Sequence, residues 1–306
     1  MRGAILQLDD SLARQPALER QVLANAGRVL AARDLGPLLR LWTRDVTLDA
    51  LRERLRRGLP DVDCAEVVFA GSGDFHHVTP LLIERAVARA DGPVTVLHFD
   101  NHPDWMRQAQ GRHCGSWVGR AARLAGVSRV ITIGVCSLDI GVRRARQGDL
   151  ELLREDRLDL FAWADPDGGD VVEIGGRAWP TICALGEGPF LDLLDTVIAT
   201  SSVYVTIDKD VLRADQALTN WDQGQASLDF VEAAVRRAAE GRRLVGADVV
   251  GDWSAPDYGG DLAARWLKRG EAFLDQPRGP PPSTEAQEVN EAANLRLWRL
   301  FTGLRA

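Results

Sequence analysis

Short apolar runs alternate with longer helical stretches along this chain of 306 residues, and this alternation constrains the fold more than any other feature. The candidate strands are residues 4–8, 38–43, 66–71, 94–99, 129–135, 158–163, 203–207 and 244–250. Several of them are apolar on both faces, as the strands of a covered parallel sheet must be. Helical patterns lie between most of them. The sequence therefore predicts a three-layer α/β/α fold with an eight-stranded, mostly parallel sheet.

The domain organisation follows from the absence of repeats and of clear boundaries, which predicts a single domain over residues 1–306. One linker-like segment, QPRGPPPS at 276–283, precedes a predicted helix at 284–303. Thr284 and Gln287 have the spacing of a capping box, and an apolar stripe follows them. We expect this helix to pack on the domain or on another subunit.

The composition excludes several classes of function. There are 44 acidic and 37 basic residues, a net charge of −7, so the chain lacks the basic surface of a nucleic-acid-binding protein. No apolar run reaches about 18 residues, which argues against a membrane span. The four cysteines form no CxxC pair and favour a reducing compartment. We expect a cytoplasmic protein that acts on a small molecule.

Ligand-type side chains follow the apolar run in LHFDNHPDW, residues 97–105. Asp100, His102 and Asp104 occupy alternate positions, so an extended backbone places them on the same side. Pro103 holds His102 extended. Ligands bind beyond the carboxyl ends of strands in open parallel sheets, and two carboxylates at such an edge need a cation.

A second strand end repeats this pattern. In VYVTIDKDVL, residues 203–212, the strand ends at Asp208 and Asp210. Together the two strand ends offer four carboxylates and at least one imidazole without thiolates, which suits divalent ions such as Mn²⁺ better than structural zinc.

The histidines gather in the same part of the chain, since all five fall between residues 76 and 113. We interpret His98, in the middle of a strand, as a core residue. His76 and His77 lie in AGSGDFHHVTP, residues 70–80, between a strand and the helix predicted to start at Thr79 and Pro80. Both therefore belong to the rim that carries the carboxylates.

These segments resemble the ureohydrolase superfamily, which includes arginase, agmatinase and formiminoglutamase. The family carries the motifs GGDH, DAHxD and SxDxD, and here SGDFHH, DNHPD and TIDKD stand at the corresponding strand ends. The resemblance covers about residues 66–254. It implies an arginase- and deacetylase-like fold, two Mn²⁺ ions per chain and a possible homo-oligomer.

The resemblance also implies a ligand set. Asp100 and Asp208 would bridge the two ions, and His102 and Asp210 would complete the shell of one of them. His77 and Asp104 would complete the other. We choose His77 over His76 because the segment RAVARADGPVTVLHFD, which leads to Asp100, is in register with the family from that residue. His76 is then expected to face the pocket in a catalytic role.

The implied reaction is Mn-dependent hydrolysis of a C–N bond in a guanidino, amidino or formimino compound, that is, in a linear amidine. Asp104 would accept a hydrogen bond from the attacking water. RHCGSW, residues 112–117, resembles the family segment that follows the metal loop, so His113 could carry a proton to the leaving amine.

The chain departs from the family in its expected substrate pocket. In ADVVGDWSAP, residues 247–256, Gly251 stands where the guanidinium-binding Glu is expected, and Asp252 follows it. We expect Asp252 to supply the negative charge. We also expect an aromatic wall that binds a planar cation through its ring faces. Its candidate residues are Trp105, Trp117, Trp221 and Trp253. These features predict a guanidino or amidino substrate other than arginine.

Two other functions stay open. The FHH sequence at 75–77 is similar to the His-His pair of deacetylase-like enzymes, which would make the protein a single-metal deacylase of an acylated amine. Loss of the expected Glu could instead indicate a non-catalytic metal-binding protein. Because both carboxylate motifs are present, we favour the two-metal hydrolase.

Overall fold

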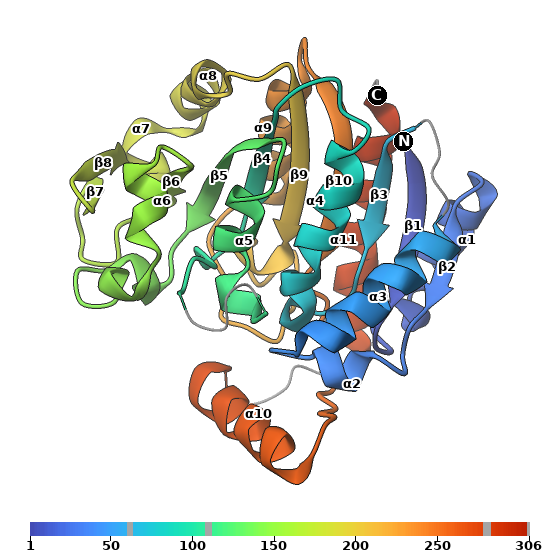
Figure 1. The fold of residues 1–306 in the computed structure, drawn as a ribbon. Coiled ribbons are helices and arrows are strands. Elements are labelled where there is room, and N and C mark those ends of the chain that lie inside the picture. Colours follow the sequence, from blue (N-terminus) through green and yellow to red (C-terminus); the bar gives the residue numbers. More distant parts are fainter. Residues whose placement is uncertain (60–63, 108–111, 278–282, 305–306) are drawn as a thin grey trace.

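The computed structural model describes residues 1–59, 64–107, 112–277 and 283–304 (Figure 1). Its centre is an eight-stranded sheet in the order β2-β1-β3-β10-β9-β4-β5-β6, and every neighbouring pair in it is parallel. The strands are β1 (Arg2–Gln7), β2 (Arg28–Ala31), β3 (Glu66–Phe69), β4 (Val94–Phe99), β5 (Val127–Val135), β6 (Leu158–Ala162), β9 (Ser202–Asp208) and β10 (Arg243–Val250). The prediction of an α/β fold with an eight-stranded parallel sheet is confirmed.

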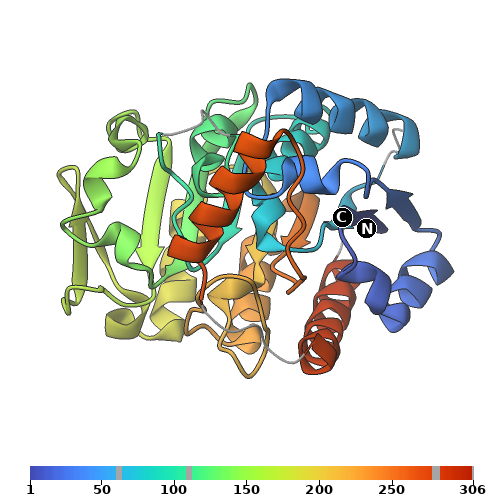
Figure 2. The same ribbon diagram turned by 90° about the horizontal axis from the view of Figure 1, so that it is seen from below.

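Helices cover both faces of this sheet, as its apolar strands require (Figures 1 and 2). One layer contains α3 (Asp45–Gly58), α4 (Thr79–Val87) and α5 (Val118–Ala122). The other contains α1 (Pro16–Ala24), α8 (Glu187–Val197), α9 (Leu228–Ala239) and α11 (Ser283–Gly303). Strands β3, β4, β9 and β10 are almost completely buried between these layers. Within the described residues, no helix is both long and apolar enough to cross a bilayer.

One predicted strand is wrong. Residues 36–39 form the short helix α2 (Gly36–Leu39), which Pro37 helps to start, so residues 38–43 contribute no strand to the sheet. The eighth strand of the sheet is instead β2, a short, half-exposed edge strand that the sequence analysis did not identify. A separate antiparallel hairpin is formed by β7 (Val171–Ile174) and β8 (Arg177–Pro180).

Two long helices follow strand β10 along the chain. Helix α10 (Leu262–Asp275), which the sequence analysis did not predict, lies below the sheet in Figure 1 and crosses the front of Figure 2 in orange-red. Helix α11 begins one residue before its predicted start, and residues 278–282 of the predicted linker lie outside the described residues. α11 packs against α1 and α9. The remaining helices are α6 (Leu150–Arg154) and α7 (Ile182–Leu185).

Candidate metal centre

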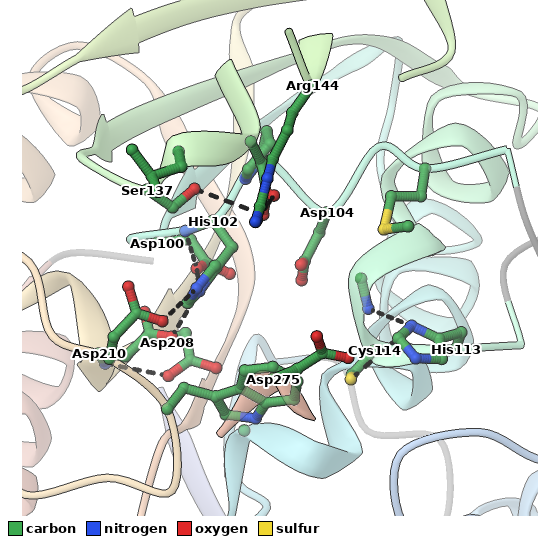
Figure 3. A pocket seen from close by; sticks show the side chains of 18 of the residues that line it. Asp100, His102, Asp104, His113, Cys114, Ser137, Arg144, Asp208, Asp210 and Asp275 are labelled. Atoms are coloured by element: carbon green, nitrogen blue, oxygen red, sulfur yellow. Dashed lines mark hydrogen bonds and ion pairs between the residues drawn. The ribbon is translucent and has the colours of Figure 1, made fainter. Parts of the chain in front are cut away.

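The register of two neighbouring strands brings the acidic motifs together. β4 and β9 pair in parallel with Phe99 opposite Ile207, so the next residues, Asp100 and Asp208, leave the sheet at the same level. Asp210 follows in a 3₁₀ turn and accepts a hydrogen bond from the backbone N–H of Asn101 at 2.9 Å. The convergence predicted for these two strand ends is therefore present (Figure 3).

His76 points its Nδ1 atom at these carboxylates. This atom lies 3.1 Å from Asp100, 3.3 Å from Asp104 and 3.5 Å from Asp208, yet it makes no hydrogen bond of normal geometry within the described chain. On the other side of the ring, Nε2 lies 2.9 Å from the Thr206 hydroxyl.

A buried carboxylate fixes the tautomer of His76. The hydroxyl of Thr206 donates its only hydrogen to Asp248 at 2.9 Å, so it must accept a hydrogen from His76 Nε2. Asp248 is held in turn by Thr79 and Tyr204. A neutral His76 therefore presents a lone pair on Nδ1 to the carboxylates, which is the orientation of a metal ligand.

His77 does not share this position. It is fully buried, and neither of its ring nitrogens has a hydrogen-bond partner among the described residues. Burial, followed by the nearby positive charges of His113 and Lys268, lowers the pKa of His77 well below its usual value. The selection of His77 over His76 as a metal ligand disagrees with the structure, because in the 3₁₀ turn Gly73–Val78 the two rings face different surroundings.

His102 forms a second donor group with Asp100 and Asp210. Its Nδ1 lies 3.0 Å from Asp210 and 3.6 Å from Asp100, while its Nε2 contacts Asp222 at 2.9 Å. Asp222 also accepts a hydrogen bond from the Asn101 side chain. A carboxylate thus orients the imidazole from behind, as is common for histidines that bind metals. The sequence analysis did not identify Asp222.

Asp100 belongs to both donor groups, and the first group also contains His76, His98 and Asp104. Both ring nitrogens of His98 have hydrogen-bond partners: Nδ1 contacts the Thr132 hydroxyl at 3.1 Å and Nε2 contacts Asp100 at 2.8 Å. We interpret His98 as a residue that positions Asp100, in keeping with its predicted core location. Burial raises the pKa of Asp100, but the contacts of its carboxylate with His102, His76 and His98 outweigh this effect and hold the pKa well below its usual value.

The other carboxylates respond to this crowding. Burial, and then the charge of Asp100, raises the pKa of Asp208 to about 7 and also raises the pKa of Asp104. Burial and the charges of Asp100 and Asp208 raise the pKa of Asp210 well above its usual value. Four carboxylates this close can all ionise only if a cation compensates them.

Two glycines make room for Asp208. A side chain at Gly73 would place its Cβ 2.5 Å from the Asp208 carboxylate. Gly251 has a φ of +92°, and a Cβ there would collide with the same carboxylate and with the backbone of Lys209. The chain therefore cannot carry a Glu at position 251 without displacing a candidate metal ligand.

Asp252 does not face the site, contrary to its predicted role in binding substrate. Its carboxylate is buried, lies 2.6 Å from Lys209 Nζ, and accepts hydrogen bonds from Gln15 and Asn294. Burial lowers the pKa of Lys209, although the charge of Asp252 opposes this effect. The pair joins β9, β10 and α11 in the interior of the protein.

A cavity of about 880 Å³ opens in front of the carboxylates (Figure 3). Asp100, His102, Asp104, Asp208 and Asp210 line one side, and Figure 3 shows His113 and Cys114 on the opposite side. Further lining residues that sequence reasoning missed are Trp42, Asp139, Arg144, Asp222, Glu271 and Asp275. This volume accommodates a small organic molecule.

The predicted aromatic wall is present only in part. Trp221 lines the cavity. Trp105 is buried, and its indole packs so closely on Gly148 that a Cβ there would lie 2.6 Å from the ring. Trp117 is also buried, and its Nε1 donates a hydrogen bond to Asp104 at 2.6 Å. Trp253 lines a separate cavity of about 180 Å³. Trp105 and Trp253 are therefore misassigned as substrate-binding residues, since neither reaches this cavity.

His113 lies where the sequence analysis expected a proton carrier. Its Nδ1 accepts a hydrogen bond from the backbone N–H of Gly115 at 2.8 Å, so a neutral ring carries its hydrogen on Nε2. That hydrogen is donated to Glu271 of α10. Burial raises the pKa of the neighbouring Cys114 well above its usual value, which argues against a nucleophilic thiol.

Comparison with known sequences gives a match of part of this chain to one family model. Residues 27–165 match the model of the arginase family. An uncharacterized protein of Thermotoga maritima is 25% identical over 186 residues, a match that spans 61% of this chain and 58% of that protein.

Comparison with solved structures places the fold. A hypothetical agmatinase from Burkholderia thailandensis superposes with a TM-score of 0.57 at 17% identity, covering 98% of this chain and 86% of the other. The formimidoylglutamase of Bacillus subtilis gives 0.56 at 15% identity, covering 95% and 88%. An arginase from Bacillus subtilis gives 0.54 at 14% identity, covering 96% and 98%.

Proposed function

We propose that this chain is a divergent member of the arginase family and a metal-dependent hydrolase that cleaves a C–N bond in a guanidino, amidino or formimino compound. The observation that carries the proposal is the buried His76 Nδ1, which lies 3.1 to 3.5 Å from three carboxylates and makes no hydrogen bond of normal geometry within the described chain. Burial lowers the pKa of His76, but Asp100 and Asp104 outweigh it and raise the pKa well above its usual value. A divalent cation can take the place of the proton that these carboxylates favour.

The donor set fits two divalent ions. His76 and Asp104 would contribute to holding one ion and His102 and Asp210 to holding the other, and Asp100 and Asp208 are the further carboxylates available to them. Carboxylate and imidazole ligands without thiolate suit Mn²⁺. When bound, such ions would supply Lewis acidity and lower the pKa of a bound water molecule.

The side chains of this protein would guide the rest of the reaction. Asp104, fixed by Trp117, can accept a hydrogen bond from the attacking water. Water adds to the central carbon, the C–N bond breaks, and the leaving nitrogen takes up a proton and departs as a neutral amine. His113 faces the carboxylates across the cavity and can deliver that proton.

Metal analysis tests the binding half of this proposal. After Mn²⁺ loading and removal of free metal, we expect about two ions per chain. Asp100→Asn and Asp208→Asn should each lower this number sharply, because each removes an oxygen shared between the two sites. Asp252→Asn is a matched control that changes a buried carboxylate outside the cavity. A single tightly held Zn²⁺ would instead favour the deacylase.

A substrate screen tests the catalytic half. The Mn²⁺-loaded protein is incubated with guanidino, amidino, formimino and acylated amines, and the released urea, ammonia, formamide or carboxylic acid is measured. Turnover of an amidine-type compound that is lost in Asp104→Asn supports the proposal. Full metal content without turnover of any of these compounds would indicate a non-catalytic metal-binding protein.

A further inference from the structure

Helix α10 forms the wall of the cavity that faces the carboxylates, and specific contacts hold it there. Lys268 is buried, and its ammonium group donates to the backbone carbonyls of Leu38 at 2.9 Å and Pro37 at 3.4 Å. The same ammonium lies 4.8 Å from the ring centre of Trp42. Just after the helix, Gln276 donates to Asp74 at 2.7 Å. Polar contacts at the middle of α10 and just after its C-terminus therefore hold the helix in position.

The two faces of α10 differ in chemistry. Lys268, Glu271 and Asp275 are spaced three and four residues apart, so they share one face of the helix, and the last two line the cavity. The opposite face exposes Leu262 and Trp266. Leu274 lines the cavity together with the two acidic residues, so the side of α10 that is turned inward is mainly, but not wholly, polar.

Two acidic side chains of α10 face the cavity, and the buried Lys268 on the same side of the helix contributes a positive charge beside them. Glu271 and Asp275 carry like charges four residues apart, in the last turns of a helix whose C-terminus is itself negative. Burial, followed by the charge of Glu271, raises the pKa of Asp275. Among the described lining residues, the one Lys or Arg is Arg144, and it already pairs with Asp139 at 3.4 Å. His113 donates a hydrogen bond from Nε2 to Glu271.

The geometry points to α10 as the specificity element of the cavity: Glu271 binds the amidinium or guanidinium group of a cationic substrate. This inference rests on the proposed function and names the chemical class of its substrate. Glu271 lies at His113, so a cation bound there is next to the candidate proton carrier and faces the carboxylates. Trp42 and Trp221 line the same cavity and supply aromatic faces for the apolar part of the molecule.

A pair of isosteric probes tests this inference without requiring turnover. Benzamidine is a cation and benzamide is neutral, and both are planar and of the same size. We expect the Mn²⁺-loaded protein to bind benzamidine more tightly in calorimetric titrations. Glu271→Gln should weaken benzamidine binding roughly ten- to a hundredfold and leave benzamide unchanged, because it removes one charged hydrogen bond. Glu271→Asp keeps the charge and should retain a preference for benzamidine.

The controls separate Glu271 from its neighbours. Asp275→Asn should reduce benzamidine binding less than Glu271→Gln, since Asp275 is the more exposed of the two. Equal benzamidine binding by Glu271→Gln and the unaltered protein would overturn the inference, and so would a larger loss in Asp275→Asn. If Glu271→Gln does not fold, the comparison of Glu271→Asp with Asp275→Asn decides the question.

Failure of this inference and failure of the proposed function give different results. Glu271-dependent benzamidine binding in a protein that turns over no C–N compound would retain the recognition site and reject the hydrolase. Turnover of a cationic amidine with equal efficiency by Glu271→Gln and the unaltered protein would reject the recognition site and retain the hydrolase.

Discussion

His76 and His77 are adjacent and both fully buried, but only one of them faces the carboxylates. The sequence could not distinguish them, because a shift of one residue within a 3₁₀ turn rotates the side chain by about a third of a turn. The start of that turn is set by Ser72, whose hydroxyl accepts a hydrogen bond from the backbone of Asp74. This capping contact can be interpreted only once the turn is known.

A matched pair of substitutions tests the assignment. His76→Leu should lose about one of two Mn²⁺ ions, because it removes a nitrogen that faces the carboxylates. His77→Leu should keep both ions. It should also leave the free energy of unfolding unchanged or higher, since His77 buries two ring nitrogens without partners in the described chain. Metal content and denaturant titration are the measurements, and loss of an ion only in His77→Leu would restore the register used in the sequence analysis.

At the scale of elements, the ends of the strands could be predicted from the sequence, but helix α10 could not. The apolar runs before Asp100 and Asp208 are buried strands, and their ends mark the site directly. Helix α10 escaped detection because it reverses the usual pattern, with Lys268 buried while Leu262 and Trp266 are exposed. Trp42 was hidden for a related reason, since it follows helix α2 where a strand was predicted.

The buried Lys268 should make the stability of this region depend on pH. Burial lowers the pKa of Lys268 to about 8, below the ordinary value of 10.5 that it regains on unfolding. Between these values the unfolded chain binds more protons than the folded one, so the folded state gains stability as pH rises. The gain is at most about 1.4 kcal/mol per pH unit.

Comparison with Lys268→Met isolates this effect. The difference in unfolding free energy between the original protein and the variant should shift in favour of the original protein from about pH 8 to pH 10, as measured by urea titration. Lys209 titrates equally in both proteins and cancels. A difference that stays constant over this range would mean that Lys268 keeps its ordinary pKa in the folded protein.

At the scale of the whole molecule, the order of the strands decides which residues meet. β9 and β10 lie between β3 and β4, so the motifs at residues 70–80, 100–104 and 206–210 share one edge, although the chain joins them by long crossovers. The order of the strands in the sheet cannot be deduced from local sequence patterns. For the same reason Asp252, next to Gly251 in sequence, pairs with Lys209 inside the protein and does not reach the cavity.

Both lysines of the chain are buried, since Lys209 is 0% exposed and Lys268 is 1% exposed. Their chemical reactivity therefore measures how readily the parts of the molecule that cover them open. An amine-acylating reagent at pH 8 should therefore modify neither lysine quickly in the folded protein and both after denaturation, as measured by peptide mass spectrometry. Lys209 is held between central strands and requires global unfolding, whereas Lys268 needs only the release of one helix. Lys268 should thus react before Lys209, and a bound amidine such as benzamidine should slow its reaction by holding α10 in place. Rapid acylation of Lys209 in the folded protein would contradict the buried pair with Asp252, and equal rates at the two lysines would show that α10 opens only with the whole molecule.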